Sequence, residues 1–228
     1  IASCLVGSEM CIRDSYQCHF KFHISPHLPT DRDVRILDLG CGYGRNIMAL
    51  RDCGYLNIVG IDISEEQVLY AKSKMGLTKI FQKDALTWLE NKTKCYECIM
   101  ILDVLEHLTL DESLAVLKKC YTALSEGGIF IIQVPNALSP LSPLWHGDIT
   151  HLRAFSPDSM SQLLRMTQWS SFKHYSLGPI PRNFKSTIRW LLWNGVLSPM
   201  IKLFMLVANS ETRGGIYTSN LLTVVTKK

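Results

Sequence analysis

Short apolar runs alternate along the chain with longer segments that carry helix signals. The runs, several of them rich in β-branched residues, predict strands at residues 34–39, 57–61, 79–82, 98–102, 129–134, 171–177 and 221–225. The segments between them predict helices at 45–53, 64–75, 85–90, 111–124 and 157–167. Strands that alternate with helices indicate an α/β fold, with a doubly wound, mostly parallel seven-stranded sheet and helices on both faces.

Capping residues and glycines mark several helix ends. Ser64, followed three residues later by Gln67, has the pattern of a capping box, and Ser156 is placed to cap the helix at 157–167. The pair Gly127 and Gly128 is expected to separate the helix at 111–124 from the next strand.

Two segments depart from the alternation. Residues 136–155 form a long connection rich in Pro, Ser, His and Trp, which we interpret as a substrate loop. Residues 180–210 form an apolar, basic insertion before the last strand, with its most apolar part at 188–208. Because Arg, Asn, Pro and Lys interrupt this part, we expect that it does not span a membrane. Trp190 and Trp193 beside basic residues suit an interfacial helix with peripheral membrane contact through 186–208, but core packing or a substrate lid is the preferred interpretation.

Length and charge favour one domain over residues 15–228, since a chain of 228 residues buries a sizeable core by itself. The net charge is only +4, but residues 159–210 hold six basic residues and no acidic one. This basic segment is apolar and the chain has no base-flipping motif, so we expect no nucleic-acid partner.

The eight cysteines are irregularly spaced, and the single C-x-x-C, Cys95 to Cys98, has no second pair of cysteines to complete a metal site. This pattern predicts reduced thiols in the cytoplasm and no metal site.

Residues 1–14 are treated separately. Their sequence resembles a translated sequencing-adapter segment, and it has neither a basic start nor an apolar run of signal-peptide length. We expect a non-native or disordered leader here, and we expect that the first helix of the domain is missing.

A glycine-rich turn, D-L-G-C-G-Y-G at residues 38–44, follows the first predicted strand and precedes a helix. Glycines let the backbone approach a ligand closely, and the helix N-terminus offers free amide groups. A turn of this type also serves dinucleotides, but their fingerprint is G-x-G-x-x-G, whereas this spacing is G-x-G-x-G.

With this turn, the chain resembles the class I S-adenosylmethionine (SAM) dependent methyltransferase superfamily, of the type 11/12/23-like kind, over residues 34–167 and again at the closing strand. The resemblance implies a Rossmann-like fold and SAM as the cofactor. It assigns Asp62 to the ribose hydroxyls, Asp84 to the adenine amino group, and Leu102 with Asp103 to the methionine end. The residues expected to bind the cofactor are Asp38, Gly40, Cys41, Gly42, Gly44, Asp62, Ile63, Asp84, Ala85, Leu102 and Asp103.

Two histidines are candidate bases. The segment D-V-L-E-H at 103–107 resembles that of ubiquinone-pathway O-methyltransferases, and His107 ends it. His151 belongs to a pattern, H-x-x-x-F-S-P, that resembles the substrate loop of methyltransferases acting on glycans and glycolipids. A histidine pKa near neutrality suits proton removal from a hydroxyl, but each residue is equally compatible with a role in holding its loop. Trp145, His146 and Arg153 are the expected substrate contacts.

The sequence therefore predicts a cytoplasmic SAM-dependent methyltransferase for a small-molecule or lipid-linked acceptor, acting on a hydroxyl of a sugar or quinone-like molecule, with membrane association through 186–208 as an open alternative. The alternatives are a SAM-binding module without activity and an NAD-dependent oxidoreductase. The oxidoreductase is disfavoured because neither a Tyr-x-x-x-Lys pair nor the dinucleotide glycine spacing is present.

Overall fold

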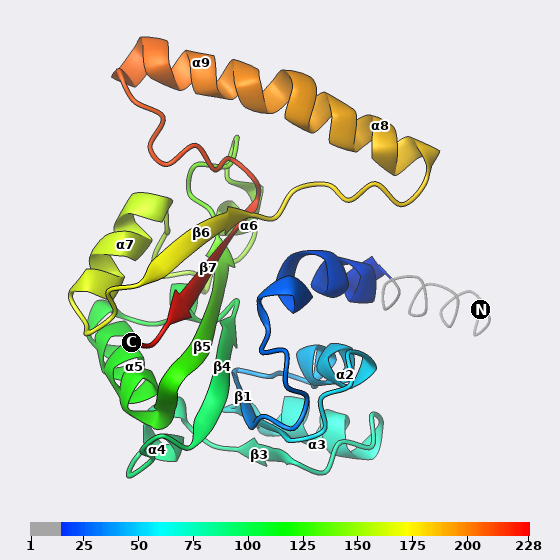
Figure 1. The fold of residues 1–228 in the computed structure, drawn as a ribbon, viewed down its shortest axis with the longest axis vertical. Helices are drawn as coiled ribbons and strands as arrows, with labels where there is room; N and C mark the ends of the chain where they lie inside the picture. Colours follow the sequence, from blue (N-terminus) through cyan, green and yellow to red (C-terminus); the bar gives the residue numbers. More distant parts are fainter. Residues whose placement is uncertain (1–14) are drawn as a thin grey trace.

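The computed structural model describes residues 15–228, and the segment expected to be a leader lies outside this range. The strands are β1 (Ile36–Leu39), β2 (Ile58–Asp62), β3 (Ile80–Gln82), β4 (Tyr96–Leu102), β5 (Leu124–Pro135), β6 (Phe172–Ser176) and β7 (Asn220–Thr226). They form one sheet in the order β3-β2-β1-β4-β5-β7-β6 (Figure 1). β1 to β5 are parallel, and β7 runs antiparallel to its neighbours β5 and β6. The predicted doubly wound, mostly parallel sheet is confirmed.

The five predicted helices lie between the strands as α2 (Arg45–Asp52), α3 (Glu65–Ser73), α4 (Ala85–Trp88), α5 (Leu110–Ala123) and α7 (Pro157–Arg165). Two short helices were not predicted: η3 (Leu105–His107), and α6 (Pro143–His146) within the expected substrate loop. The insertion contains α8 (Phe184–Leu192), η4 (Trp193–Leu197) and α9 (Ser198–Asn209). The Ser64 and Ser156 side chains accept hydrogen bonds from the backbone amides three residues on, so both predicted caps are confirmed.

The structure corrects two expectations about element boundaries. Residues 15–19 are helical and continue into η1 (Phe20–Ile24) and η2 (Ser25–His27), so a helical segment precedes β1. Its Phe20 and Ile24 are buried in the core, so apolar packing holds this segment against the sheet. Gly127 and Gly128 lie inside β5 instead of separating it from α5, because the backbone there hydrogen-bonds to Lys227 near the chain's end.

Apolar residues on the two faces of the sheet form two cores. β4 shows the alternation that divides them: Ile99 and Ile101 face the core under α5 and α7, whereas Cys98, Met100 and Leu102 face the core under α2, α3 and η1. Because both faces are covered, the central strands read as continuous apolar runs, which made them visible in the sequence.

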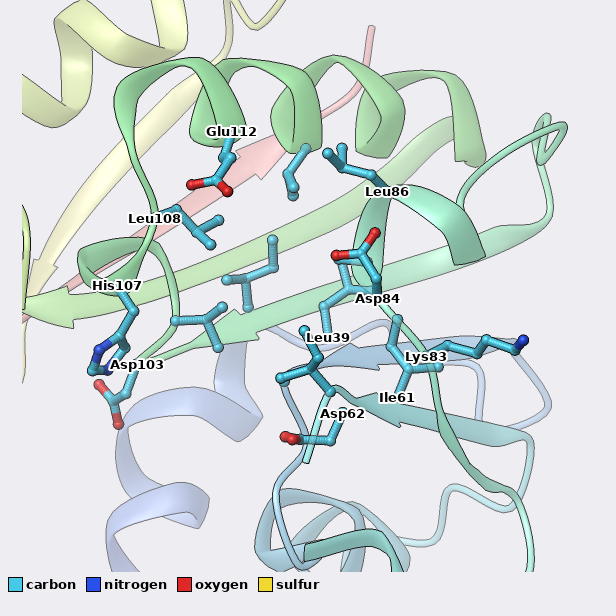
Figure 2. Close-up of a pocket in the computed structure, with 16 residues that line it drawn as sticks. Leu39, Ile61, Asp62, Lys83, Asp84, Leu86, Asp103, His107, Leu108 and Glu112 are labelled. Carbon is cyan, nitrogen blue, oxygen red and sulfur yellow. The ribbon is translucent and has the colours of Figure 1, made fainter. Parts of the chain in front are cut away.

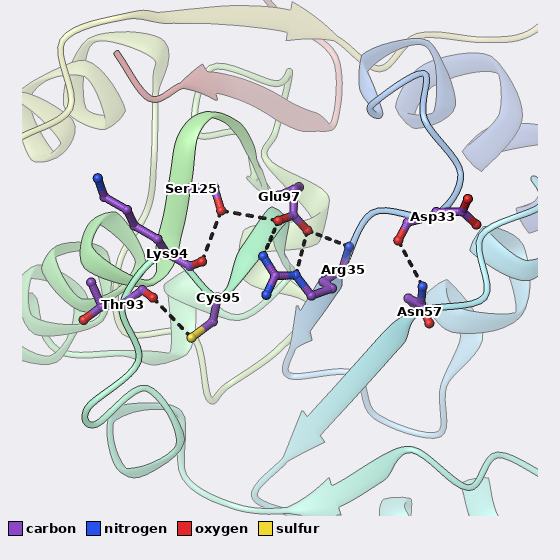
Figure 3. Close-up of polar contacts among 8 residues, drawn as sticks. All are labelled: Asp33, Arg35, Asn57, Thr93, Lys94, Cys95, Glu97 and Ser125. Carbon is purple, nitrogen blue, oxygen red and sulfur yellow. Dashed lines mark hydrogen bonds and ion pairs between the residues drawn. The ribbon is translucent and has the colours of Figure 1, made fainter.

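At the amino edge of the sheet, an ion pair joins the starts of β1 and β4. Glu97 accepts hydrogen bonds from the backbone amide of Arg35 at 2.8 Å and from its Nε at 3.1 Å, and it forms an ion pair with the same guanidinium (Figure 3). This pairing lowers the pKa of the Glu97 carboxyl. This ion pair ties the starts of two central strands together, whereas ligands of open α/β sheets bind at the opposite, carboxyl edge.

The insertion is one continuous helix from Phe184 to Asn209, long and apolar enough to cross a membrane by length and composition alone. The polar residues and Pro199 therefore do not break the helix. The π-helical turn η4 lies directly ahead of Pro199, where the backbone hydrogen-bonding pattern already changes, and the helix continues past the proline.

Candidate active site

The turn after β1 depends on its glycines. Gly40, Gly42 and Gly44 have φ angles of 73°, 53° and 89°, a region that residues with a Cβ seldom adopt. A Cβ added to Gly40 would also lie 2.3 Å from a methyl carbon of Val104, so this glycine lets the turn pack against the segment after β4. Gly44 is the N-cap of α2, and the turn places the start of that helix at the carboxyl edge.

The carboxylate of Asp62, at the end of β2, is held by two backbone amides. One oxygen accepts from the amide of Gly42 at 2.7 Å, and the other accepts from the amide of Ser64 at 2.8 Å. Asp62 therefore links the glycine turn to the end of the neighbouring strand. Each carboxylate oxygen has a second lone pair, so both can accept a further hydrogen bond from a ligand.

A cavity of about 350 Å³ lies along the carboxyl ends of β1 to β4 (Figure 2). Its lining includes six of the residues predicted to bind the cofactor: Gly40, Asp62, Ile63, Asp84, Ala85 and Asp103. The other five, Asp38, Cys41, Gly42, Gly44 and Leu102, are not among the residues that line it. Apolar side chains supply much of the remaining wall: Leu39, Ile61, Leu86, Ile101, Val104, Leu108 and Val116. The cavity is large enough for a ligand of cofactor size and combines apolar walls with carboxylates.

Asp84 and Asp103 are each oriented by one neighbour. Asp84 caps α4, with Oδ1 accepting from the amide of Thr87 at 2.9 Å. Asp103 has a positive φ of 57°, and both of its carboxylate oxygens lie 3.0 Å from the Nε2 of Gln133 on β5. Gln133 was not predicted as a site residue, although its position as a polar residue within the apolar run 129–134 indicates a polar contact there.

Asp38 lies behind the glycine turn and is fully buried. Its Oδ1 is 3.4 Å from the Nδ2 of Asn46, and its Oδ2 has no hydrogen-bond partner. Burial raises the pKa of the Asp38 carboxyl to about 7. The structure thus places Asp38 beneath the turn that borders the cavity.

The two candidate bases come together although they are distant in sequence. His107 lines the cavity, and its ring centroid lies 4.8 Å from that of His151. The Nδ1 of His107 is 2.9 Å from the Oγ1 of Thr150, which in turn lies 2.7 Å from a carboxylate oxygen of Asp148. The single hydroxyl proton of Thr150 goes to the carboxylate, so Thr150 is left to accept from Nδ1–H of His107. In a neutral ring with this tautomer, Nε2 of His107 has a lone pair.

His151 is held from the substrate loop. Its ring stacks on Trp145 with centroids 5.5 Å apart, and its Nδ1 is 3.2 Å from the Trp145 carbonyl oxygen. His146, at the end of α6, is exposed. The Nε of Arg153 is buried without a hydrogen-bond partner, and the Arg153 backbone amide donates to the carbonyl of Glu106 at 3.2 Å. Trp145 therefore borders the histidine pair from the loop, Arg153 is joined to Glu106 through its backbone amide, and His146 is exposed to solvent.

Glu106 is a site residue that the sequence did not single out. Its side chain is fully buried, and neither carboxyl oxygen has a hydrogen-bond partner. Burial raises the pKa of this carboxyl to about 8. One ligand-type atom from each of Glu106, His107 and His151 lies within 4.8 Å of the others, and these residue types can hold a divalent cation.

Solved structures of methyltransferases share this fold. A SAM-dependent methyltransferase from Archaeoglobus fulgidus matches with a TM-score of 0.68 at 21% identity, over 94% of both chains. A possible histamine N-methyltransferase from Thermotoga maritima matches with a TM-score of 0.65 at 17% identity, over 98% of this chain and 94% of that one. Phosphoethanolamine N-methyltransferase 2 of Haemonchus contortus, in complex with SAM, matches with a TM-score of 0.59 at 15% identity, over 90% of this chain and 51% of that one.

None of the curated protein sequences matches the chain. A family of domains described as "Methyltransferase domain" matches residues 18–174, which is more than half of the chain and contains the glycine turn, the cavity and both histidines. The chain therefore belongs to this methyltransferase domain family.

Proposed function

We propose that this chain is a SAM-dependent methyltransferase that acts on a hydroxyl of a small-molecule or lipid-linked acceptor, such as a sugar or a quinone-like molecule. The observation that carries the proposal is the arrangement of Asp62, Asp84 and Asp103 along one cavity, with His107 beside it (Figure 2). In open α/β sheets, ligands bind at this carboxyl edge.

The residues present fit SAM. The Asp62 carboxylate has two free lone pairs for a vicinal diol, and its orientation is fixed by the amides of Gly42 and Ser64. Asp84 uses one oxygen to cap α4, and the other is available for an adenine amino group. Asp103, held by Gln133, is placed for the ammonium of the methionine end. When bound, SAM supplies an electrophilic methyl group on a sulfonium.

His107 is the proton acceptor in this proposal. A hydroxyl that becomes methylated must lose its proton, and the lone pair on Nε2 of His107 is the group that takes it. Thr150 and Asp148 hold the required tautomer, with Asp148 ionised because its hydrogen bonds from Thr150 lower the pKa of its carboxyl. His151, in the substrate loop, packs against the His107 ring.

Labelled methyl transfer tests the activity. SAM carrying a labelled methyl group, incubated with panels of sugar, lipid-linked and phenolic hydroxyls, should label one class, and addition of EDTA should leave turnover unchanged. Activity lost with EDTA and restored by a divalent cation would assign the Glu106 cluster to a metal instead. Calorimetry separates the alternatives, because NAD binding without SAM binding supports an oxidoreductase, and SAM binding without turnover on any acceptor supports an inactive module.

We also propose a cytoplasmic location, which is supported by the cysteines. In the described part of the chain, six cysteines are free thiols, as expected in a reducing compartment.

A further inference from the structure

The α8–α9 helix, defined as residues 184–209, presents an apolar surface that the domain does not cover. Twelve of its large apolar side chains, from Phe184 to Val207, are exposed. Neither core of the domain contains a residue of this helix. Figure 1 shows it lying beyond the end of the sheet, joined to β6 and β7 by extended segments. An apolar surface of this extent marks a binding face.

The helix lies at the same edge of the sheet as the cavity. β6 runs parallel to β5, because both are antiparallel to β7, so β6 ends and β7 begins at the carboxyl edge. The substrate loop leaves β5 at this edge too, and it carries further exposed apolar side chains, with Leu141 94% and Ile149 99% exposed. Two segments distant in sequence thus present apolar residues on the side where the acceptor enters.

The chain's path argues against a helix that crosses a bilayer. A helix of 26 residues is about 39 Å long, enough to cross a bilayer. If it crossed, however, residues 210–219 would have to return through the lipid to reach β7. Those ten residues reach at most about 35 Å, include Glu211 and Arg213, and would leave backbone groups without partners in hydrocarbon. An interfacial orientation avoids all of these costs.

The basic residues of this region indicate which kind of bilayer the helix binds. Residues 159–210 contain six basic residues and no acidic one, and Arg182, Lys185 and Arg189 are exposed around the first turns of the helix. Basic side chains beside an apolar helix bind bilayers whose headgroups are anionic.

We propose that the α8–α9 helix lies in the surface of an anionic phospholipid bilayer and holds the carboxyl edge of the sheet against it. The acceptor hydroxyl then belongs to a lipid or lipid-linked molecule that reaches the cavity from the bilayer. This second statement rests on the proposed function, whereas membrane binding does not.

Flotation with vesicles tests the binding. The full chain should float with vesicles that contain phosphatidylglycerol and much less with vesicles of phosphatidylcholine alone. Leu203→Glu, which places a charge on the apolar face, should lower the partition coefficient by about tenfold or more. Leu56→Glu is the matched control, because Leu56 is 72% exposed and Leu203 63%, but Leu56 precedes β2 at the opposite edge. Circular dichroism and SAM calorimetry verify that both variants fold and keep the cavity.

Three results would overturn the proposal: no flotation at low salt, equal loss in both variants, or a dimer in light scattering that Leu203→Glu dissociates without any vesicle binding. Equal binding to both vesicle types would overturn the anionic preference. Transfer of label from SAM to a polyisoprenoid-linked sugar hydroxyl in the vesicles, but not to the free sugar, is expected for the acceptor. Because flotation needs no SAM, failure of the membrane proposal and failure of the proposed function are distinguishable.

Discussion

Substituting Asp62 with Asn tests the core of the proposed cofactor site. The carboxylate accepts from the amide of Gly42 with one oxygen and from the amide of Ser64 with the other. An Asn side chain has one acceptor oxygen and one NH₂ group, so in either orientation one backbone N–H faces a donor. The variant keeps the size of the side chain and removes one acceptor and the charge.

The magnitude follows from these two contacts. An N–H left without an acceptor costs about 1–3 kcal/mol, and because Asp62 is only half-buried we expect the lower half of this range for the free energy of unfolding. Loss of a charged acceptor for a ligand hydroxyl costs about 1.5–3 kcal/mol, which weakens SAM binding by about 10-fold to 150-fold.

Calorimetry with SAM and urea denaturation measure the two effects. Asp84→Asn is the control for stability, because Asn caps helices about as well as Asp, and the free energy of unfolding should change by less than about 0.5 kcal/mol. If Asp62→Asn loses stability but binds SAM within about twofold of the native chain, Asp62 only holds the turn, and the assignment to the ribose hydroxyls is refuted.

Three further predictions concern the base, the buried carboxyl and the glycine turn. His107→Ala should lower kcat by about 10²-fold to 10⁴-fold at saturating SAM, and Thr150→Val should lower kcat with little change in KM; unchanged turnover in both would exclude this base. The Glu106 pKa is raised from 4.5 to about 8, so the folded chain holds a proton that the unfolded chain releases, and the free energy of unfolding falls as pH rises between these values. Glu106→Gln should flatten this fall, by at most about 1.4 kcal/mol per pH unit, in urea titrations at several pH values; an unchanged slope would contradict the assignment. Gly40→Ala should lower the free energy of unfolding by about 1–3 kcal/mol more than Gly127→Ala, because both have positive φ but only Gly40 would meet a neighbouring side chain; equal losses would rule out the close approach.

The sheet and the cavity-lining carboxylates were predictable because local sequence specifies them. β1, β4 and β5 are buried on both faces and therefore read as apolar runs. Asp62 ends β2, Asp103 directly follows β4, and Asp84 follows β3 after one residue. The carboxyl ends of parallel strands necessarily meet at one edge.

Contacts between distant segments were not predictable. His107 and His151 meet only because the substrate loop folds back onto the segment after β4, where Leu152 donates its backbone amide to the Glu106 carbonyl at 2.7 Å. Glu106 lies between Leu105 and His107 and reads as an ordinary surface residue, since burial of a single carboxyl leaves no periodic pattern.

The orientation of the insertion relative to a membrane was also not predictable from the sequence alone. Arg189, Asn194, Pro199 and Lys202 count as interruptions in the sequence and predict that the segment does not span a membrane, yet the helix is continuous and passes by length and composition. The path of the chain on either side, which returns to the same edge of the sheet, is what argues against a membrane span, and that path is known only from the topology.

A crystal structure of the chain with S-adenosylhomocysteine is the most direct test of whether SAM binds in the cavity. We expect the ligand there, with its ribose hydroxyls on the Asp62 carboxylate and its adenine beside Asp84. A ligand bound elsewhere, or in the cavity with the ribose away from Asp62, would contradict it.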